Sequence, residues 1–144
     1  MLTINDIKKA VADKIRSKYN YKIYRNDVKE GYERPSFFIR VLPILTNLET
    51  ANLIHSKVTV EITYFQQQKS EVDNLQKAED LRQLFTGKLA VNERQLTIED
   101  LRIEFAGQED DVLQVLFDLD YYDAVTKTDT YDIMRELKLS EVNE

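Results

Sequence analysis

Two stretches of alternating apolar and polar residues constrain the fold of this chain most strongly. Ser56–Phe65 and Leu113–Tyr121 each carry an apolar side chain at every second position. Successive side chains of a β-strand point to opposite faces, so this spacing predicts two strands of a half-exposed antiparallel sheet. The residues predicted to face the core are Val58, Val60, Ile62, Tyr64, Leu113, Val115, Phe117, Leu119 and Tyr121.

Two amphipathic helices are expected to pack on that sheet. Thr3 with Asp6, and Ser70 with Asp73, follow the pattern of a capping hydroxyl with an acid three residues later. The first helix is predicted to run to about Lys18, and the second to stop near Gly87. The apolar stripes are Ile4, Ile7, Val11 and Ile15 in the first helix, and Val72, Leu75, Ala78, Leu81 and Phe85 in the second.

Shorter strands and loops account for the remaining chain. A strand is predicted at Ser36–Leu42, ending at Pro43 because proline cannot donate a hydrogen bond to a ladder. Thr46–His55 is predicted to be a loop or extended turn, and Gly107–Asp111 an acidic hairpin connection. Further short strands are expected at Tyr21–Tyr24, Leu89–Val91, Leu96–Ile98 and Leu101–Phe105, with a short tail helix around Tyr131–Leu137.

These elements predict a single α+β domain over residues 1–144. An antiparallel or mixed sheet packs against the two amphipathic helices, and residues 126–144 form a partly flexible C-terminal tail that contains the short helix. No apolar run reaches the roughly 18 residues that a membrane-spanning helix needs. Because the N-terminus also lacks a signal-peptide pattern, we expect a soluble protein that stays where it is made.

Composition excludes several classes of function. The chain has no cysteine, so it forms no disulfide and no cysteine-ligated zinc site. Its net charge of −6 argues against wholesale nucleic-acid binding, which needs basic residues at the phosphates. Residues 1–50 carry ten Lys/Arg and six Asp/Glu, whereas residues 99–144 carry four Lys/Arg and fourteen Asp/Glu. Two interpretations are open. The basic part of one copy could meet the acidic part of another, or folding could intersperse the two kinds of charge on one surface.

The loop Arg25–Pro35 is the first candidate site. Its predicted interaction residues are Arg25, Lys29, Gly31, Tyr32 and Arg34. Basic residues interleaved with tyrosines stack on single-stranded nucleic acid in some proteins and form protein interfaces in others. The negative net charge favours a protein interface, without sequence-specific nucleic-acid binding. We expect this loop to be mobile in a free subunit and ordered in an assembly.

A second candidate site is acidic. Asp110 and Asp111 lie in the predicted hairpin connection, and Asp118 and Asp120 share one face of the last long strand. With Glu104, the latter pair suggests a Mg²⁺ site and a metal-dependent enzyme as one alternative. No glycine-rich phosphate loop accompanies these residues, so a solvated acidic surface is the favoured interpretation. The single histidine, His55, is interpreted as a surface residue.

Three segments carry a resemblance to a known family: EGYERPSFFI at Glu30–Ile39, VTVEITYF at Val58–Phe65 and LQVLFDLDY at Leu113–Tyr121. In this order, and behind the helical opening TINDIKKAV, they resemble the tail-terminator family encoded by phages and prophages of Gram-positive bacteria. The resemblance spans nearly the whole chain and rests on structural patterns. No catalytic residue belongs to this family, so the resemblance implies a chain that is not an enzyme and needs no metal or cofactor.

The resemblance implies a structural protein of virion assembly. Similar proteins form a ring, usually of six subunits, that caps the completed tail tube, ends its polymerisation and provides the surface for head-to-tail joining. The implied partners are other copies of this chain, the tail tube protein and a neck or connector protein, and free subunits can be monomers. The implied locations are the host cytoplasm during assembly and the virion tail. A neck or head–tail connector protein of the same particle is the alternative.

Overall fold

The computed structural model describes residues 1–25 and 31–124. These residues form two helices and a six-stranded mixed sheet, which confirms the predicted α+β class. Lys29, the predicted tail helix Tyr131–Leu137 and the tail 126–144 lie outside the described residues. The elements are α1 (Ile4–Arg16), β1 (Lys22–Tyr24), β2 (Ser36–Thr50), β3 (Leu53–Phe65), α2 (Glu71–Leu84), β4 (Lys88–Val91), β5 (Arg94–Ala106) and β6 (Val112–Ala124).

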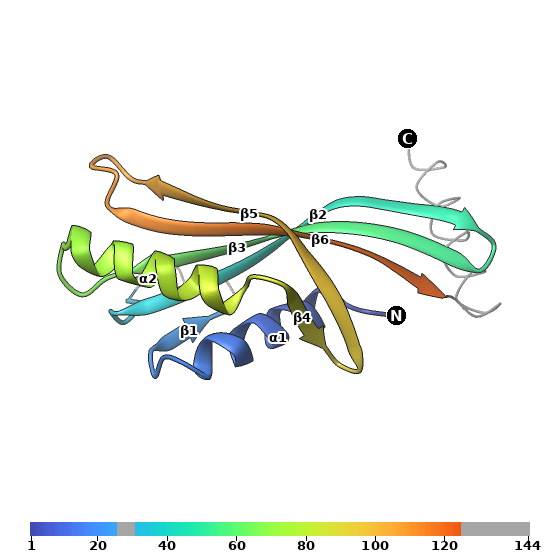
Figure 1. The fold of residues 1–144 in the computed structure, drawn as a ribbon, viewed down its shortest axis with the longest axis horizontal. Coiled ribbons are helices and arrows are strands. Elements are labelled where there is room, and N and C mark those ends of the chain that lie inside the picture. The colour runs from blue at the N-terminus through green and yellow to red at the C-terminus, as the bar shows by residue number, and fades with distance from the viewer. Residues whose placement is uncertain (26–30, 125–144) are drawn as a thin grey trace.

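The strands lie in the order β1-β2-β3-β6-β5-β4 within one curled sheet (Figure 1). β1 runs parallel to β2, and the other neighbouring strands are antiparallel. Both helices pack on the same face of the sheet (Figure 1). This order places β1 and β2, from the N-terminal part of the chain, at one lateral edge and β5 with β4 at the other.

The central strands β3 and β6 confirm the predicted alternation. Their register runs from Leu53–Ala124 to Tyr64–Leu113 without a shift. Every residue that the alternation assigned to the core is buried. Together with the buried side chains of α1 and α2 they form one hydrophobic core between sheet and helices. Each fully buried aliphatic or aromatic side chain contributes roughly 2 kcal/mol to folding through the hydrophobic effect.

The predicted end of β2 at Pro43 was wrong. β2 continues to Thr50, and Thr46–His55, predicted to be a loop, belongs to the hairpin of β2 and β3. A register shift between Pro43 and Leu45 accommodates the proline, which a strand near a sheet edge tolerates better than a central one. This hairpin and the end of β6 extend past both helices as a wing (Figure 1).

A second correction concerns β5. Leu96–Ile98 and Leu101–Phe105 were predicted as separate strands, but both belong to β5. An irregularity between Glu99 and Arg102 bends the strand, and Asp100 there has a φ of 51°. Bulges of this kind increase local twist, which explains how the first half of β5 turns away to pair with β4.

The helix starts are confirmed, but the apolar stripe of α2 is only half right. Thr3 Oγ1 accepts a hydrogen bond from the Asp6 amide at 3.1 Å, as the capping pattern predicted. In α2, Leu81 is fully buried, whereas Val72 and Leu75 are 78% and 52% exposed. The first turns of α2 therefore do not reach the core. No helix in the two described ranges is long and apolar enough to cross a membrane.

Lys77 holds the polar half of α2 against the sheet. Its Nζ lies 5.2, 5.5 and 5.3 Å from the ring centroids of Tyr19, Tyr21 and Tyr64, and 2.8 Å from Oδ1 of Asp73. Tyr64 donates its hydroxyl hydrogen to Oδ2 of Asp73 at 2.7 Å. Burial raises the pKa of Asp73, but the hydrogen bonds from Lys77 and Tyr64 outweigh it and hold this pKa below its ordinary value. A buried ammonium is thus surrounded by aromatic faces and one carboxylate.

The buried face of β3 gives a first prediction. Val60 is fully buried, so Val60→Asp places an unpaired carboxylate in the core, and we expect a loss of roughly 4 kcal/mol in the free energy of unfolding. Asn47→Asp in the exposed wing is the control, and its cost should stay below about 0.5 kcal/mol. Urea unfolding of both variants measures the difference, and equal losses would show that this register is wrong.

The Lys77 cluster gives a second prediction. Lys77→Met removes the partner of Asp73, and we expect it to cost roughly 3 kcal/mol near neutral pH. Because the folded pKa of Asp73 is lowered, its stabilising contribution is present above the unfolded value of 3.8 and is lost as the pH falls through the folded pKa. Unfolding of the wild type and the variant near pH 7 and near pH 2.5 should show a smaller difference in acid. If the difference does not depend on pH, the Lys77–Asp73 pair is not the source of this stability. Gln83→Met on the exposed side of α2 is the control.

Candidate functional site

Most of the candidate contact residues lie on the face of the sheet opposite the helices, which we call the outer face. Phe37 and Ile39 of β2 point into the core, so the alternate residues Phe38 and Arg40 point outward. Glu61 of β3 lies directly beside Arg40 in the antiparallel register. The same alternation that builds the core therefore builds a second, helix-free surface.

Four rings pack together where β1, β2 and β3 meet, and we call Tyr24, Tyr32, Phe38 and Phe65 the aromatic cluster. Ring centroids lie 4.8 Å apart for Tyr24 and Phe38, and 5.1 Å apart for Phe38 and Phe65. Tyr32 is 5.3 Å from Phe38 and 5.1 Å from Phe65. Such tilted and edge-on contacts each add about 0.5–1.5 kcal/mol beyond burial. The cluster is thus a preformed aromatic surface.

Arg34 covers the aromatic cluster. Its guanidinium carbon lies 5.2 Å from the ring centroid of Tyr32 and 5.5 Å from that of Phe65. It donates hydrogen bonds to the Tyr32 hydroxyl at 2.7 Å and to the Gln66 carbonyl at 3.3 Å. Two of the predicted interaction residues, Tyr32 and Arg34, are therefore brought together. Gly31 precedes them with a φ of 70°, a conformation that glycine adopts without strain.

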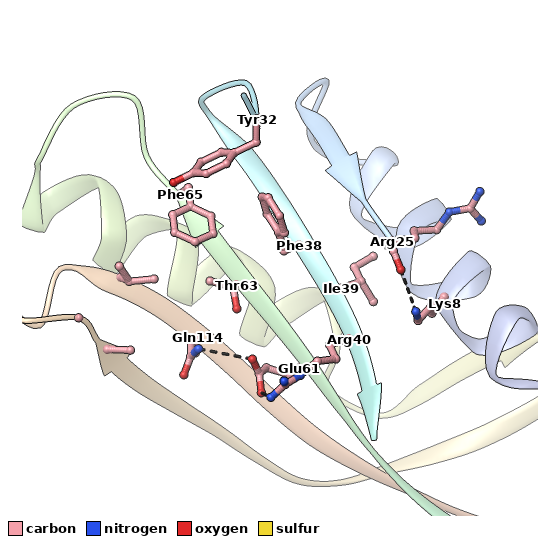
Figure 2. A pocket seen from close by; sticks show the side chains of 13 residues that line it. Lys8, Arg25, Tyr32, Phe38, Ile39, Arg40, Glu61, Thr63, Phe65 and Gln114 are labelled. Atoms are coloured by element: carbon pink, nitrogen blue, oxygen red, sulfur yellow. Dashed lines mark hydrogen bonds and ion pairs between the residues drawn. The ribbon is translucent and has the colours of Figure 1, made fainter. Parts of the chain in front are cut away.

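A hollow of about 690 Å³ opens beside this cluster, and we call it the outer hollow (Figure 2). Tyr32, Phe38 and Phe65 line one side, while Lys8 and Arg25 line another. The Lys8 ammonium donates a hydrogen bond to the Arg25 carbonyl at 2.8 Å, which ties α1 to the start of the loop. Aromatic surface beside basic side chains suits a protein segment with apolar and acidic residues.

The floor of the outer hollow is a polar ladder across three strands (Figure 2). Arg40 of β2 donates to Glu61 of β3 at 3.1 Å, and Gln114 of β6 donates to the other oxygen of Glu61 at 3.5 Å. Sequence reasoning centred on the loop missed Lys8, Phe38 and Arg40 as lining residues. The alternation in Ser36–Leu42 could have identified Phe38 and Arg40, because it assigns them to the face opposite Phe37.

Asp118 is not the solvated surface residue that the sequence predicted. It is only 8% exposed, accepts a hydrogen bond from the Thr59 hydroxyl at 2.8 Å and lies 3.5 Å from a guanidinium nitrogen of Arg102. Neighbouring strands supply these partners on both sides, which sequence alternation alone does not show. Asp120 lies one outer-face position further along β6, with Oδ1 2.5 Å from Nε2 of His55.

His55 is likewise not in a loop but in β3. Its ring stacks on Tyr122 with centroids 4.5 Å apart, and its Nδ1 lies 3.4 Å from the Glu49 carboxylate. The contacts of His55 therefore join β2, β3 and β6 across the outer face of the wing. This arrangement gives the single histidine a structural role.

Asp110 and Asp111 lie at the opposite end of β6, in the turn after β5. Asp110 has a φ of 53°, and the Asp111 carbonyl accepts a hydrogen bond from the Asn74 side chain at 2.8 Å. The strand from Val112 to Asp118 spans about 20 Å. The structure thus divides the predicted acidic surface into a turn pair and a pair on the outer face.

The outer-face carboxylates do not form a metal cage. Glu104 lies beside Gln114, about 13 Å along β6 from Asp118. Among the described residues no group of three or more His, Asp or Glu side chains could hold a metal ion. The arrangement of aromatic surface, paired charges and open hollow is suited to protein contacts.

This geometry gives a third prediction. Calorimetric titration of the chain with Mg²⁺ or Mn²⁺ should show no site tighter than about millimolar, because Asp118 and Asp120 lack the further oxygen ligands of a proper cage. Asp118→Asn and Asp120→Asn should leave the titration unchanged. A micromolar site that either substitution abolishes would contradict this account of the two carboxylates.

One solved structure matches this chain with 12% sequence identity and a TM-score of 0.44, and the match covers 88% of this chain and 98% of the other chain. No curated protein matches the sequence.

A family model, described as phage tail terminator protein, matches residues 6–131. The match includes both central strands, all of α2, all but the first two residues of α1, and the residues of the outer hollow. The chain therefore belongs to the phage tail terminator family, whose members are structural proteins of the virion tail and not enzymes.

Proposed function

We propose that this chain caps a completed phage tail tube as a ring, ends tube polymerisation and provides the surface on which head and tail join. The family match over residues 6–131 carries this proposal. The ring of six that the family resemblance implies, the Gram-positive host and a cytoplasmic assembly stage are part of the same proposal.

The outer hollow is our candidate for contact with another tail component. It combines half-buried aromatic side chains with the side chain of Arg25, which has no ion pair among the described residues. Interfaces draw most of their binding energy from a few aromatic and arginine side chains. The tail tube protein and the neck or connector protein are the two components that the proposed position at the tube end would bring within reach.

A fourth prediction tests the function. Deleting the gene from the phage or prophage should give tails of uncontrolled length that fail to join heads, because nothing stops tube growth. Tail lengths in electron micrographs measure this, and the wild-type gene supplied in trans should restore a single length. Tails of normal length that still fail to join heads would point to a neck or connector protein and overturn the proposal.

The same complementation can examine the outer hollow. Tyr32→Ala removes one ring of the aromatic cluster, and Tyr122→Ala removes an exposed ring from the wing as a matched control. We expect Tyr32→Ala to complement poorly while still folding, and Tyr122→Ala to complement. Full complementation by folded Tyr32→Ala would remove the outer hollow from the proposal.

A further inference from the structure

A second hollow, of about 530 Å³, lies between the start of α2 and the turn from β5 to β6, and we call it the edge groove. Its apolar lining is Leu75 and Phe105, which are 52% and 39% exposed. Carboxylates crowd its rim, and these are Glu71, Glu109, Asp110 and Asp111. Only Glu109 of these four has an ion pair among the described residues, with Lys69. The groove therefore combines uncovered apolar surface with uncompensated negative charge.

The apolar lining is exposed because α2 leaves the edge of the sheet uncovered. Phe105 lies beside Leu113, which is fully buried, so both side chains point to the helix-bearing face. Leu113 is covered there, whereas Phe105 on the outermost long strand is not. Leu75 belongs to the apolar stripe of α2, yet it faces this edge and not the core. An apolar stripe that its own domain does not bury is typical of a surface that a partner covers.

The opposite lateral edge has the complementary charge. β1 presents Lys22, which is exposed, and Arg25 follows it; neither makes an ion pair among the described residues. Ile23 between them is half-buried and packs against the core. The order of strands places basic β1 and the acidic turn between β5 and β6 at opposite edges of one sheet.

The strand registers place Ile23 at one edge and Phe105 at the other edge in the same row of paired residues across the sheet. Ile23 pairs with Phe37, Phe37 with Tyr64, Tyr64 with Leu113, and Leu113 with Phe105. One straight row across the sheet therefore begins at Ile23 and ends at Phe105. The row crosses five strands and measures about 19 Å, since neighbouring strands lie about 4.8 Å apart. Two copies placed side by side in the plane of the sheet would bring the start of one row to the end of the next.

We propose that the edge groove receives the β1 edge of a second copy of this chain, with Ile23 against Leu75 and Phe105. Lys22 then meets the carboxylates of the rim. Strand direction fits this contact, because β1 runs antiparallel to β5 within the sheet, as antiparallel neighbours require. The contact is head-to-tail and closes into a ring when its rotation divides a full turn. This inference rests on the proposed ring and assigns the two surfaces that build it.

Cysteine crosslinking tests the contact cleanly because the chain has no cysteine of its own. Lys22→Cys and Ala106→Cys occupy the two edges, and Ala106 lies next to Phe105 at the end of the row. Within one subunit these positions are about 19 Å apart, too far for a disulfide. The double variant replaces the native chain in the phage, and tails are purified, oxidised and separated without reductant. We expect a ladder of linked copies that ends at one closed species.

Single variants and a control pair sharpen the result. Tails built from a mixture of the Lys22→Cys and Ala106→Cys chains should contain linked dimers of the two different chains and few dimers of either alone. Lys9→Cys with Asn47→Cys, both at exposed positions away from these edges, should give no ladder. Dimers linked through Lys22→Cys on both chains, or a ladder only in the control pair, would overturn the head-to-tail contact.

The same gels separate this inference from the proposed function. Tails that contain the variant chain at its normal amount but yield no ladder overturn the assignment of the two edges and leave the ring proposal standing. Tails of normal length that contain no copies of the chain overturn both. Charge reversal provides a second readout, because Lys22→Glu and Asp110→Lys chains should each fail to complement alone, and should complement when expressed together.

Discussion

The uninterrupted pairing of β3 with β6 is the constraint on which the rest of this structure depends. Because side chains alternate between faces, a slip of one residue would turn Val60, Ile62 and Val115 out of the core. The helices pack on the inner faces of the two strands. The outer faces carry the polar ladder that forms the floor of the outer hollow. β2 and β5 then add on either side, so the two lateral edges of the molecule follow from the same register.

Pairing between strands also decides which charges remain free for partners. On the outer face Glu61 is bonded by Arg40 and Gln114, and Asp118 by Thr59, so these groups are satisfied within the subunit. Among the described residues, the charges without an ion pair include Lys22 and Arg25 at the β1 edge, and Asp110 and Asp111 at the turn between β5 and β6. A tail terminator that must be held in place by other proteins needs its free charges where neighbours can reach them.

The sequence predicted the fold well wherever one face of an element meets the core. It failed where the core does not reach: the wing beyond Pro43 resembled a loop, and Val72 resembled a core residue of α2. The sequence predicted two separate strands where β5 bends at Asp100, because a bulge interrupts the alternation of apolar and polar residues. The candidate site was predicted in part, since Tyr32 and Arg34 do come together. The partners of Asp118 and His55 come from other strands, and only the register between strands reveals them.

We propose that this chain terminates a phage tail as a ring, and cryo-electron microscopy of intact tails would show the ring itself. We expect a closed ring of this chain at the head-proximal end of the tube, with the β1 edge of each subunit against the edge groove of the next. Density for the chain within the neck, separated from the tube by another protein, would rule this proposal out. So would tails whose tube end is closed by a different protein.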